Sequence, residues 1–221
     1  MDRNMLLGIL AVTLIALAAA ILLPGGRTVE SEPKLPWIID VKSPEKLSVL
    51  GITLGESTLG EVEIQLSEGA KVTLFRSIDN KYAVEAYFQR IDLSSIRADL
   101  VVTLDVDTAT SDEMFNRGIR ISNSSSGAKK VTLSSKDLER IKQAKISHIT
   151  YIPATDLEED LILGRFGEPT ERLKELHSKT VHWLYPEKGL DIAVNPNGKE
   201  VFQYIRPAHF DLVTAPLRDK Q

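Results

Sequence analysis

Apolar and polar residues between positions 58 and 106 follow first the period of a helix and then that of strands. The helix is expected to begin with Thr58 and Glu61, which have the form of a capping box, and to end at Gly69. Its apolar positions are Leu59, Val62 and Leu66. Strand-like runs follow at 71–75, 82–88 and 98–106. The pattern predicts a helix packed on a short antiparallel meander.

The same plan returns between residues 154 and 207. Thr155 and Glu158 again have a capping-box form, and Gly167 and Pro169 are expected to end the helix. The apolar positions of this helix are Leu157, Leu161, Ile162 and Phe166. Strands are expected at 171–176, 180–185, 190–194 and 200–205. Residues 84–88 correspond to residues 181–185, which indicates a duplicated unit.

The chain therefore divides into segments with different patterns, and the two helix–meander units predict an α+β fold. Between the units, a short helix at 111–117, a hairpin of 119–122 with 130–133, a helix from Ser134 and a strand at 146–152 form an insert. The expected segments are an N-terminal tail at 1–4, a membrane anchor at 5–23, a tether at 24–46, the first unit at 47–108, the hairpin–helix insert at 109–153, the second unit at 154–207 and a polar, loose tail at 208–221.

The run from Met5 to Leu23 contains no charged residue. A helix of this length, at about 1.5 Å per residue, spans close to the ~30 Å hydrocarbon core of a bilayer. The alternative is a cleaved signal peptide with a small-residue site at 18–20, but the apolar run continues past that site. A count of Lys and Arg on either side leans toward a cytoplasmic folded part, whereas the short N-terminal tail is typical of an exported one. We expect export.

Composition excludes several kinds of site. The net charge of −4 disfavours a general nucleic-acid-binding protein, which needs a basic face for phosphate contacts. The chain has no cysteine, so it has no disulfide, thiolate nucleophile or lipid-modified cysteine.

Candidate catalytic and metal-binding residues each have a structural explanation. The four histidines lack the helical spacing of a zinc protease, so no metal or other cofactor is predicted. Asp105 and Asp107 alternate at a strand end, without the further oxygen ligands that Ca²⁺ requires. The serine-rich run at 124–127 lacks the flanking glycines of a nucleophile elbow.

A family resemblance is carried by the second unit. Its short capped helix, Phe166-Gly-x-Pro169, the strand with Trp183 and Tyr185, and Gly198-Lys-Glu-Val201 resemble the SmpA/OmlA type of envelope lipoprotein, whose members belong to the outer-membrane protein assembly machinery. The tandem form is similar to the β-lactamase-inhibitor-protein architecture, in which two such units present a joint concave sheet to a partner. The chain departs from the lipoproteins because it lacks the lipidation cysteine and carries an apolar span. As a whole it also resembles single-span envelope proteins of Gram-negative bacteria.

Strand alternation predicts which sheet face binds a partner. Val84, Ala86 and Phe88 in the first unit and Val181, Trp183 and Tyr185 in the second are expected to face the helices. The opposite face, with its mixture of aromatic, apolar and ionisable groups, is expected to be open. For the last strand, Phe202 and Tyr204 suit the core as well as this open face. The predicted partner-binding residues are Glu85, Tyr87, His182, Leu184, Phe202 and Tyr204.

These observations predict an inner-membrane, single-pass protein with a periplasmic folded part. Its expected function is non-catalytic binding to another envelope or inner-membrane protein, as an accessory subunit of a membrane complex. Two alternatives stay open: an envelope enzyme with a shallow site built from Glu85 and His182, and a sensor that binds a small ligand or glycan on the open sheet face.

Overall fold

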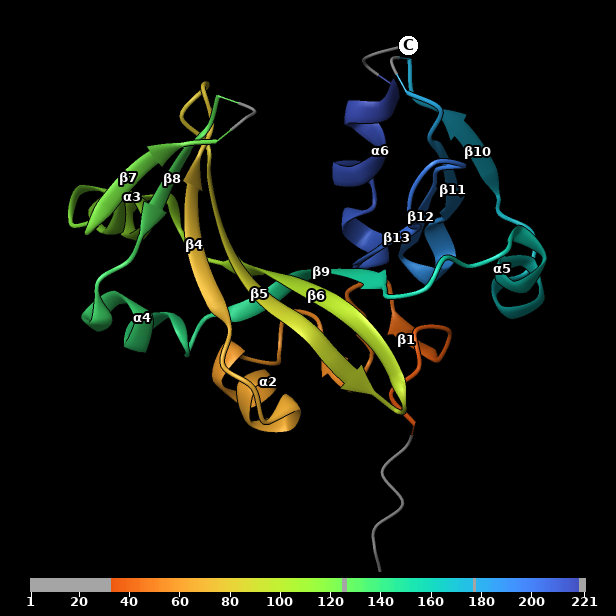
Figure 1. Cartoon of the computed structure of the whole chain (residues 1–221), viewed down its shortest axis with the longest axis horizontal. Helices are drawn as coiled ribbons and strands as arrows, with labels where there is room; N and C mark the ends of the chain where they lie inside the picture. Colours follow the sequence, from red (N-terminus) through yellow and green to blue (C-terminus); the bar gives the residue numbers. More distant parts are fainter. Residues whose placement is uncertain (1–32, 125–126, 177, 219–221) are drawn as a thin grey trace, which may run out of the picture. The chain divides into compact units, whose positions relative to one another are not determined.

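The computed structural model describes residues 33–124, 127–176 and 178–218, which belong to one compact unit, Pro33–Gln221. The described residues form an α+β fold around a ten-stranded antiparallel sheet, in the order β10-β11-β12-β13-β9-β6-β5-β4-β8-β7 (Figure 1). Its strands are β4 (Lys71–Arg76), β5 (Tyr82–Leu93), β6 (Ile96–Asp105), β7 (Arg120–Asn123), β8 (Lys129–Thr132), β9 (Lys145–Pro153), β10 (Glu171–Lys174), β11 (Val181–Tyr185), β12 (Leu190–Val194) and β13 (Val201–Ile205).

The two predicted meanders are halves of this one sheet. β4, β5 and β6 form the first meander and β10 to β13 the second, in agreement with the predicted strands. β9 pairs with β6 on one side and with β13 on the other. This strand was expected within a separate insert, whereas it lies between the meanders and makes the sheet continuous. The hairpin of β7 and β8, also predicted in the insert, extends the sheet beyond β4.

A second, three-stranded sheet precedes the first helix. It consists of β1 (Ile39–Ser43), β2 (Lys46–Val49) and β3 (Ile52–Thr53). The prediction of a tether at 24–46 is therefore wrong from residue 39 onward, because β1 and the first residue of β2 lie within it. These residues become ordered because the strands after β1 bury Leu47, Val49 and Ile52 in the main core.

The helices that open the two units begin differently. Helix α2 (Leu59–Leu66) has the predicted capping box, since Thr58 accepts a hydrogen bond from the Glu61 amide and Glu61 accepts one from the Thr58 amide. It ends at Ser67, which has a φ of 54°, and not at Gly69. Helix α5 (Glu159–Phe166) begins after Glu158 without a side-chain cap, so the capping box predicted at Thr155 is wrong.

The segment before α5 explains why this helix has no side-chain cap. The amide of Leu157 donates to the Glu200 carboxylate at 2.8 Å, which ties this segment to the chain before β13 and keeps it out of the helix. The end of α5 is as predicted: Gly167 has a φ of 80°, which favours glycine.

Two further helices lie in the insert. Helix α3 (Thr108–Asn116) is capped by Asp107, which accounts for one of the aspartates considered as a cation ligand. Helix α4 (Ser135–Ile141) is capped by Ser134, as predicted. The buried carboxylate of Asp137 in α4 receives a hydrogen bond of 2.8 Å from Arg117, which joins the ends of α3 and α4.

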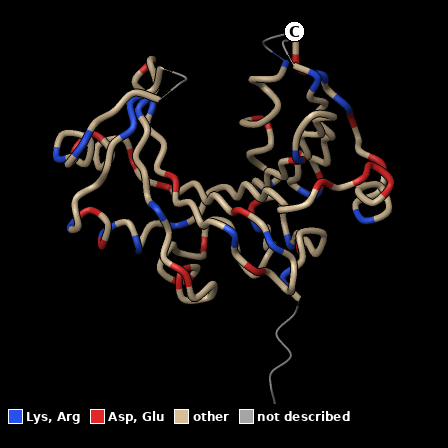
Figure 2. Tube along the Cα trace, viewed as in Figure 1, with Lys and Arg blue, Asp and Glu red and all other residues tan. Residues whose placement is uncertain are grey.

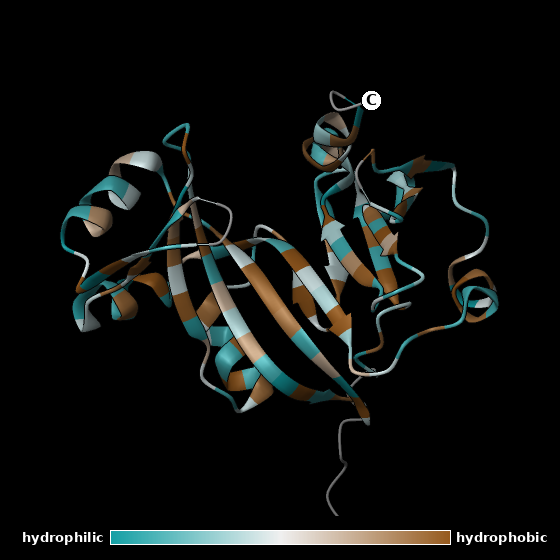
Figure 3. Cartoon of the chain, turned by 45° about the horizontal axis from the view of Figure 1, so that its top comes forward, coloured by the Kyte–Doolittle hydropathy of each residue, from teal (hydrophilic) through white to brown (hydrophobic). Residues whose placement is uncertain are grey.

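The main core lies on one face of the sheet. Apolar and polar residues alternate along β5 and β6 (Figure 3). Val84, Ala86 and Phe88 point into this core, as predicted. Residues from α2, α3, α4, α5 and β1–β3 complete the core. In Figure 1 the sheet curves, with α2 and β1 on its convex side.

Among the described residues, the opposite, concave side is covered at one end only. Helix α6 (Asp211–Arg218) lies there, over the second half of the sheet (Figure 1). Phe210 just before α6 forms a small second core with Leu173, Leu184 and Ile205, against which Val213 and Leu217 of α6 pack. The prediction of a loose tail at 208–221 is therefore wrong for residues 211–218. Three apolar residues at helical spacing, Phe210, Val213 and Leu217, account for this contact.

Candidate functional site

The uncovered part of the concave side carries two of the predicted site residues. Glu85 and Tyr87 of β5 are half-buried and point away from the main core. With residues of β4, β6 and β8 they line a hollow of about 320 Å³. The other residues lining it are Lys71, Thr73, Phe75, Val101 and Lys130. Sequence reasoning did not select these, because the contact between β8 and β4 is not evident from the sequence.

The hollow combines the carboxylate of Glu85 with basic and aromatic side chains. Within the described part of the chain, the Glu85 carboxylate makes no hydrogen bond or ion pair. Burial raises the pKa of Glu85, and the nearby charge of Lys130 opposes this shift. The Lys130 ammonium lies 5.8 Å from the centre of the Phe75 ring. The Tyr87 hydroxyl donates to Asp99 at 3.0 Å, which holds its ring at one wall.

The other four predicted site residues are buried, so the prediction that they form an open patch is wrong. Leu184, 1% exposed, lies under α6. Phe202 and Tyr204 point into the main core, because β13 lies between β12 and β9 and its inward face meets Tyr151 and Phe166. The Tyr204 hydroxyl donates to the carbonyl of Pro36 at 2.9 Å. Trp183 and Tyr185 are in the main core, as predicted.

His182, the last of the four, forms a buried polar cluster. Its Nδ1 is 2.8 Å from the Asp191 carboxylate on β12, and its Nε2 is 3.1 Å from Glu175, which follows β10. The carboxylate of Glu175 also accepts a hydrogen bond from the Ser178 hydroxyl at 2.5 Å. Asp191 is 0% exposed, and its second oxygen has no hydrogen-bond partner among the described residues.

Burial and pairing act in opposite directions on the pKa values of this cluster. Burial alone would lower the pKa of His182, but hydrogen bonds and charges of Asp191 and Glu175 outweigh it and raise this pKa. Burial also raises the pKa of Asp191, against the opposing effect of His182. Asp191 was not selected from the sequence, although a single aspartate within the apolar run at 190–194 was a usable signal for a buried partner.

His182 and Glu85 do not form a common site. Strands β6, β9, β13 and β12 lie between β5 and β11. At about 4.8 Å per strand, the two backbones are roughly 24 Å apart along the sheet. His182 is also only 5% exposed, with both ring nitrogens occupied. The arrangement offers no reacting group to a substrate at this position.

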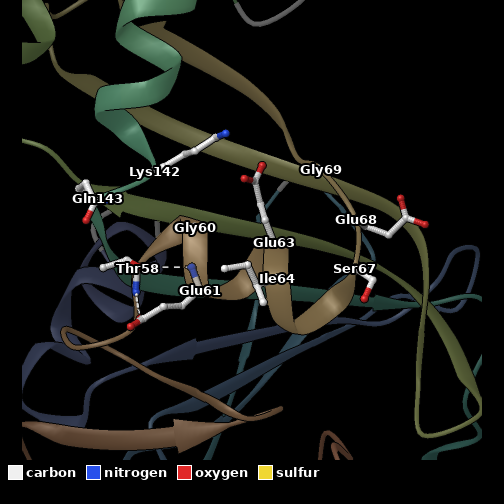
Figure 4. A pocket seen from close by; sticks show the side chains of 10 residues that line it. All are labelled: Thr58, Gly60, Glu61, Glu63, Ile64, Ser67, Glu68, Gly69, Lys142 and Gln143. Atoms are coloured by element: carbon white, nitrogen blue, oxygen red, sulfur yellow. Dashed lines mark hydrogen bonds between the residues drawn. The ribbon is translucent and has the colours of Figure 1, made fainter.

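Another hollow, of about 650 Å³, lies along α2 on the other side of the molecule and is called the α2 groove here. Figure 4 shows Glu63 of α2 and Lys142, which follows α4, pointing toward the same opening. Ile64 of α2 is 81% exposed, and Glu68 lies at the far end beside Gly69. Glu61 adds a third carboxylate, so acidic side chains outnumber the single lysine.

Basic side chains gather instead on β7 and β8, where Figure 2 shows several Lys and Arg positions. We call Ile119, Arg120, Ile121, Lys129 and Lys130 the basic hairpin. Ile119 is 68% exposed and Ile121 is 50% exposed. Arg120 and Lys129 form no ion pair with any described residue.

Comparisons of the chain with protein-family models, with curated proteins and with solved structures found no match. The resemblance to SmpA/OmlA-type lipoproteins therefore stays a prediction. No helix in the described ranges is long and apolar enough to cross a membrane, and the run from Met5 to Leu23 lies outside those ranges. The described residues also contain no cluster of three or more His, Asp or Glu side chains that could hold a metal ion.

Proposed function

We propose that this chain is a non-catalytic binding protein of the cell envelope, which recognises a protein partner through the uncovered concave face of β4, β5, β6 and β8. The observation that carries the proposal is the hollow around Glu85 and Tyr87. It combines aromatic rings, two lysines and a half-buried carboxylate without a partner in the described chain. Such a mixture is typical of protein interfaces, where aromatic and basic side chains anchor a partner.

The composition of the hollow favours a protein partner over a small molecule. Side chains of four neighbouring strands line it, and five of the seven lining residues are polar or charged. Small-molecule sites enclose most of their ligand and are chiefly apolar. A sensor for a small ligand or glycan on the same face is the alternative to be separated by experiment.

We further propose that residues 5–23 anchor the protein in the inner membrane with the folded unit in the periplasm, and that the two helix–meander units arose by duplication. The support for the anchor is the uncharged apolar run of the sequence. Alkaline-phosphatase fusions after Arg27 and after Gln221 test it: both should be active. Inactive fusions, with active cytoplasmic reporters at the same positions, would contradict export.

The binding face is tested by site-specific photocrosslinking of the full chain in its native membranes. A photoreactive residue at position 87 should give a discrete protein adduct, which Lys130→Ala weakens. The matched control is position 212 on α6, where Leu212 is 62% exposed but lies on the covered half. Equal adducts at both positions, or none at 87, would contradict the proposal; competition by a soluble glycan would favour the sensor.

A further inference from the structure

We propose that copies of this chain associate head to tail, with the basic hairpin of one copy seated in the α2 groove of the next. The basic hairpin shares Lys130 with the partner-binding face, whereas neither surface includes Glu85 or Tyr87. In this arrangement a second copy of this chain binds at each of the two surfaces.

The groove has the features of a receiving site. Its volume of about 650 Å³ is the larger of the two hollows described above. Glu61, Glu63 and Glu68 surround it, and Lys142 is already paired with Glu139 at 3.0 Å. Ile64 stands 81% exposed among these charges. A well-exposed isoleucine at the centre of an acidic rim is suited to a partner with an apolar centre and a basic rim.

The basic hairpin has the complementary composition. Ile121 on β7 and Ile119 just before it are exposed, and within the described residues β7 pairs with β8 only. Arg120, Lys129 and Lys130 accompany them on the two strands. In Figure 1, β7 and β8 lie at the outer edge of the first half of the sheet, beside α3.

The two surfaces cannot meet within one copy. In Figure 1, α2 lies below the first half of the sheet and the β7–β8 hairpin above it. A contact between them must join two molecules. Because the surfaces differ, the contact is heterologous and repeats from copy to copy, either in a row or in a closed ring. Direct pairing of two β7 edges is disfavoured, because it brings Arg120, Lys129 and Lys130 of both copies together.

Charge reversal in the full-length protein, solubilised in detergent, tests the contact by sedimentation velocity. The hairpin variant is Arg120→Glu/Lys129→Glu, which leaves Lys130 of the other hollow unchanged, and the groove variant is Glu63→Lys/Glu68→Lys. The wild type should associate as its concentration rises. Association should be weaker in about 0.5 M salt, where charges more than roughly 4 Å apart are largely screened. Each variant alone should associate at least about tenfold more weakly than the wild type, because like charges then face each other.

The mixture of the two variants decides the question. Each variant offers the other a complementary hairpin and groove, so an equimolar mixture should recover association. The proposal is overturned if the wild type does not associate, if each variant alone associates as the wild type does, or if the mixture does not recover. The first result excludes the contact, the second points to another surface such as the N-terminal segment, and the third excludes direct pairing of hairpin and groove.

Two controls keep this result interpretable. Glu63 accepts a hydrogen bond from the Ala70 amide, so a second groove variant, Ile64→Lys/Glu68→Lys, replaces two exposed side chains that make no hydrogen bond in the described chain. It should weaken association to a similar degree. Leu212→Ser, at an exposed leucine of α6, should leave association unchanged. A loss of association in Leu212→Ser equal to that in the groove variants would also overturn the proposal.

Discussion

β5 and β11 are each the second strand after the helix that opens their unit, yet the outward face of β5 is partly exposed and that of β11 is buried. On β5, Glu85 and Tyr87 border an open hollow, whereas on β11 the corresponding His182 and Leu184 are buried. The strands themselves do not cause this difference, since both alternate between the two faces in the same way. Helix α6 packs over Leu184, and His182 is enclosed with Asp191 and Glu175, whereas no described segment covers Glu85 and Tyr87 in this way. The comparison shows that a sheet face becomes a surface or a core according to what packs on it.

The largest expected effect separates core from surface on β13. Tyr204→Ala should lower the free energy of unfolding by about 3–5 kcal/mol, because it leaves a cavity in the main core. It also removes the hydrogen bond to the Pro36 carbonyl. Urea denaturation measures the loss, and Tyr204→Phe isolates the hydrogen bond at about 1 kcal/mol. A stability change below about 1 kcal/mol in Tyr204→Ala would place this residue back on the surface.

The next largest effect concerns the packing of α6 on the second half of the sheet. Phe210→Ala should cost about 2–4 kcal/mol, because Phe210 is 6% exposed and fills the small core against Leu184 and Ile205. Fluorescence of a hydrophobic dye should rise as this face opens. Leu212→Ala, at an exposed position of the same helix, is the matched control and should change stability by less than about 0.5 kcal/mol. Equal effects of the two substitutions would show that α6 does not pack as described.

A smaller effect depends on pH and distinguishes the polar cluster from the open hollow. The pKa of His182 is raised above 6.5, so its contribution to stability is complete below that pH and is lost as the pH rises through the folded-state pKa. The raised pKa of Asp191 acts in the same direction, because burying its charged form costs stability, but this loss begins at lower pH, above the ordinary aspartate pKa of 3.8. Stability measured in urea between about pH 6 and pH 9 should therefore decline.

Asp191→Asn tests the origin of this decline. The substitution keeps the size of the side chain and removes its charge, so the pKa of His182 should fall and the decline should become shallower. NMR titration of the His182 ring measures the pKa directly. An unchanged titration in Asp191→Asn would contradict the described pairing.

The smallest expected stability change belongs to the open half. Tyr87→Ala should alter stability by about 1 kcal/mol or less, since the residue is half-buried and loses one hydrogen bond to Asp99. The same substitution should abolish most of the adduct formed at a photoreactive residue placed at position 101, which lines the same hollow. Thermal unfolding followed by circular dichroism checks the first expectation. Global unfolding of Tyr87→Ala would mean that the hollow is part of the core.

Local pattern determined much of the fold. The strands of both meanders, the capping box of α2, the cap of α4 and the end of α5 at Gly167 all follow from short stretches of sequence. These features depend on side-chain alternation and on hydrogen bonds within a few residues, which the sequence contains directly. The inward positions Val84, Ala86 and Phe88 followed for the same reason.

Tertiary structure alone decided which strand faces are available to a partner. The pairing of β9 with both meanders, the position of β13 between β12 and β9, and the seat of α6 on Leu184 each join residues distant in sequence. Alternation divides a strand into two faces, but it does not say whether a later segment covers the second one. The sequence by itself therefore determined the strands and the inward side of β5, while long-range packing buried His182, Leu184, Phe202 and Tyr204 and left Glu85 and Tyr87 accessible.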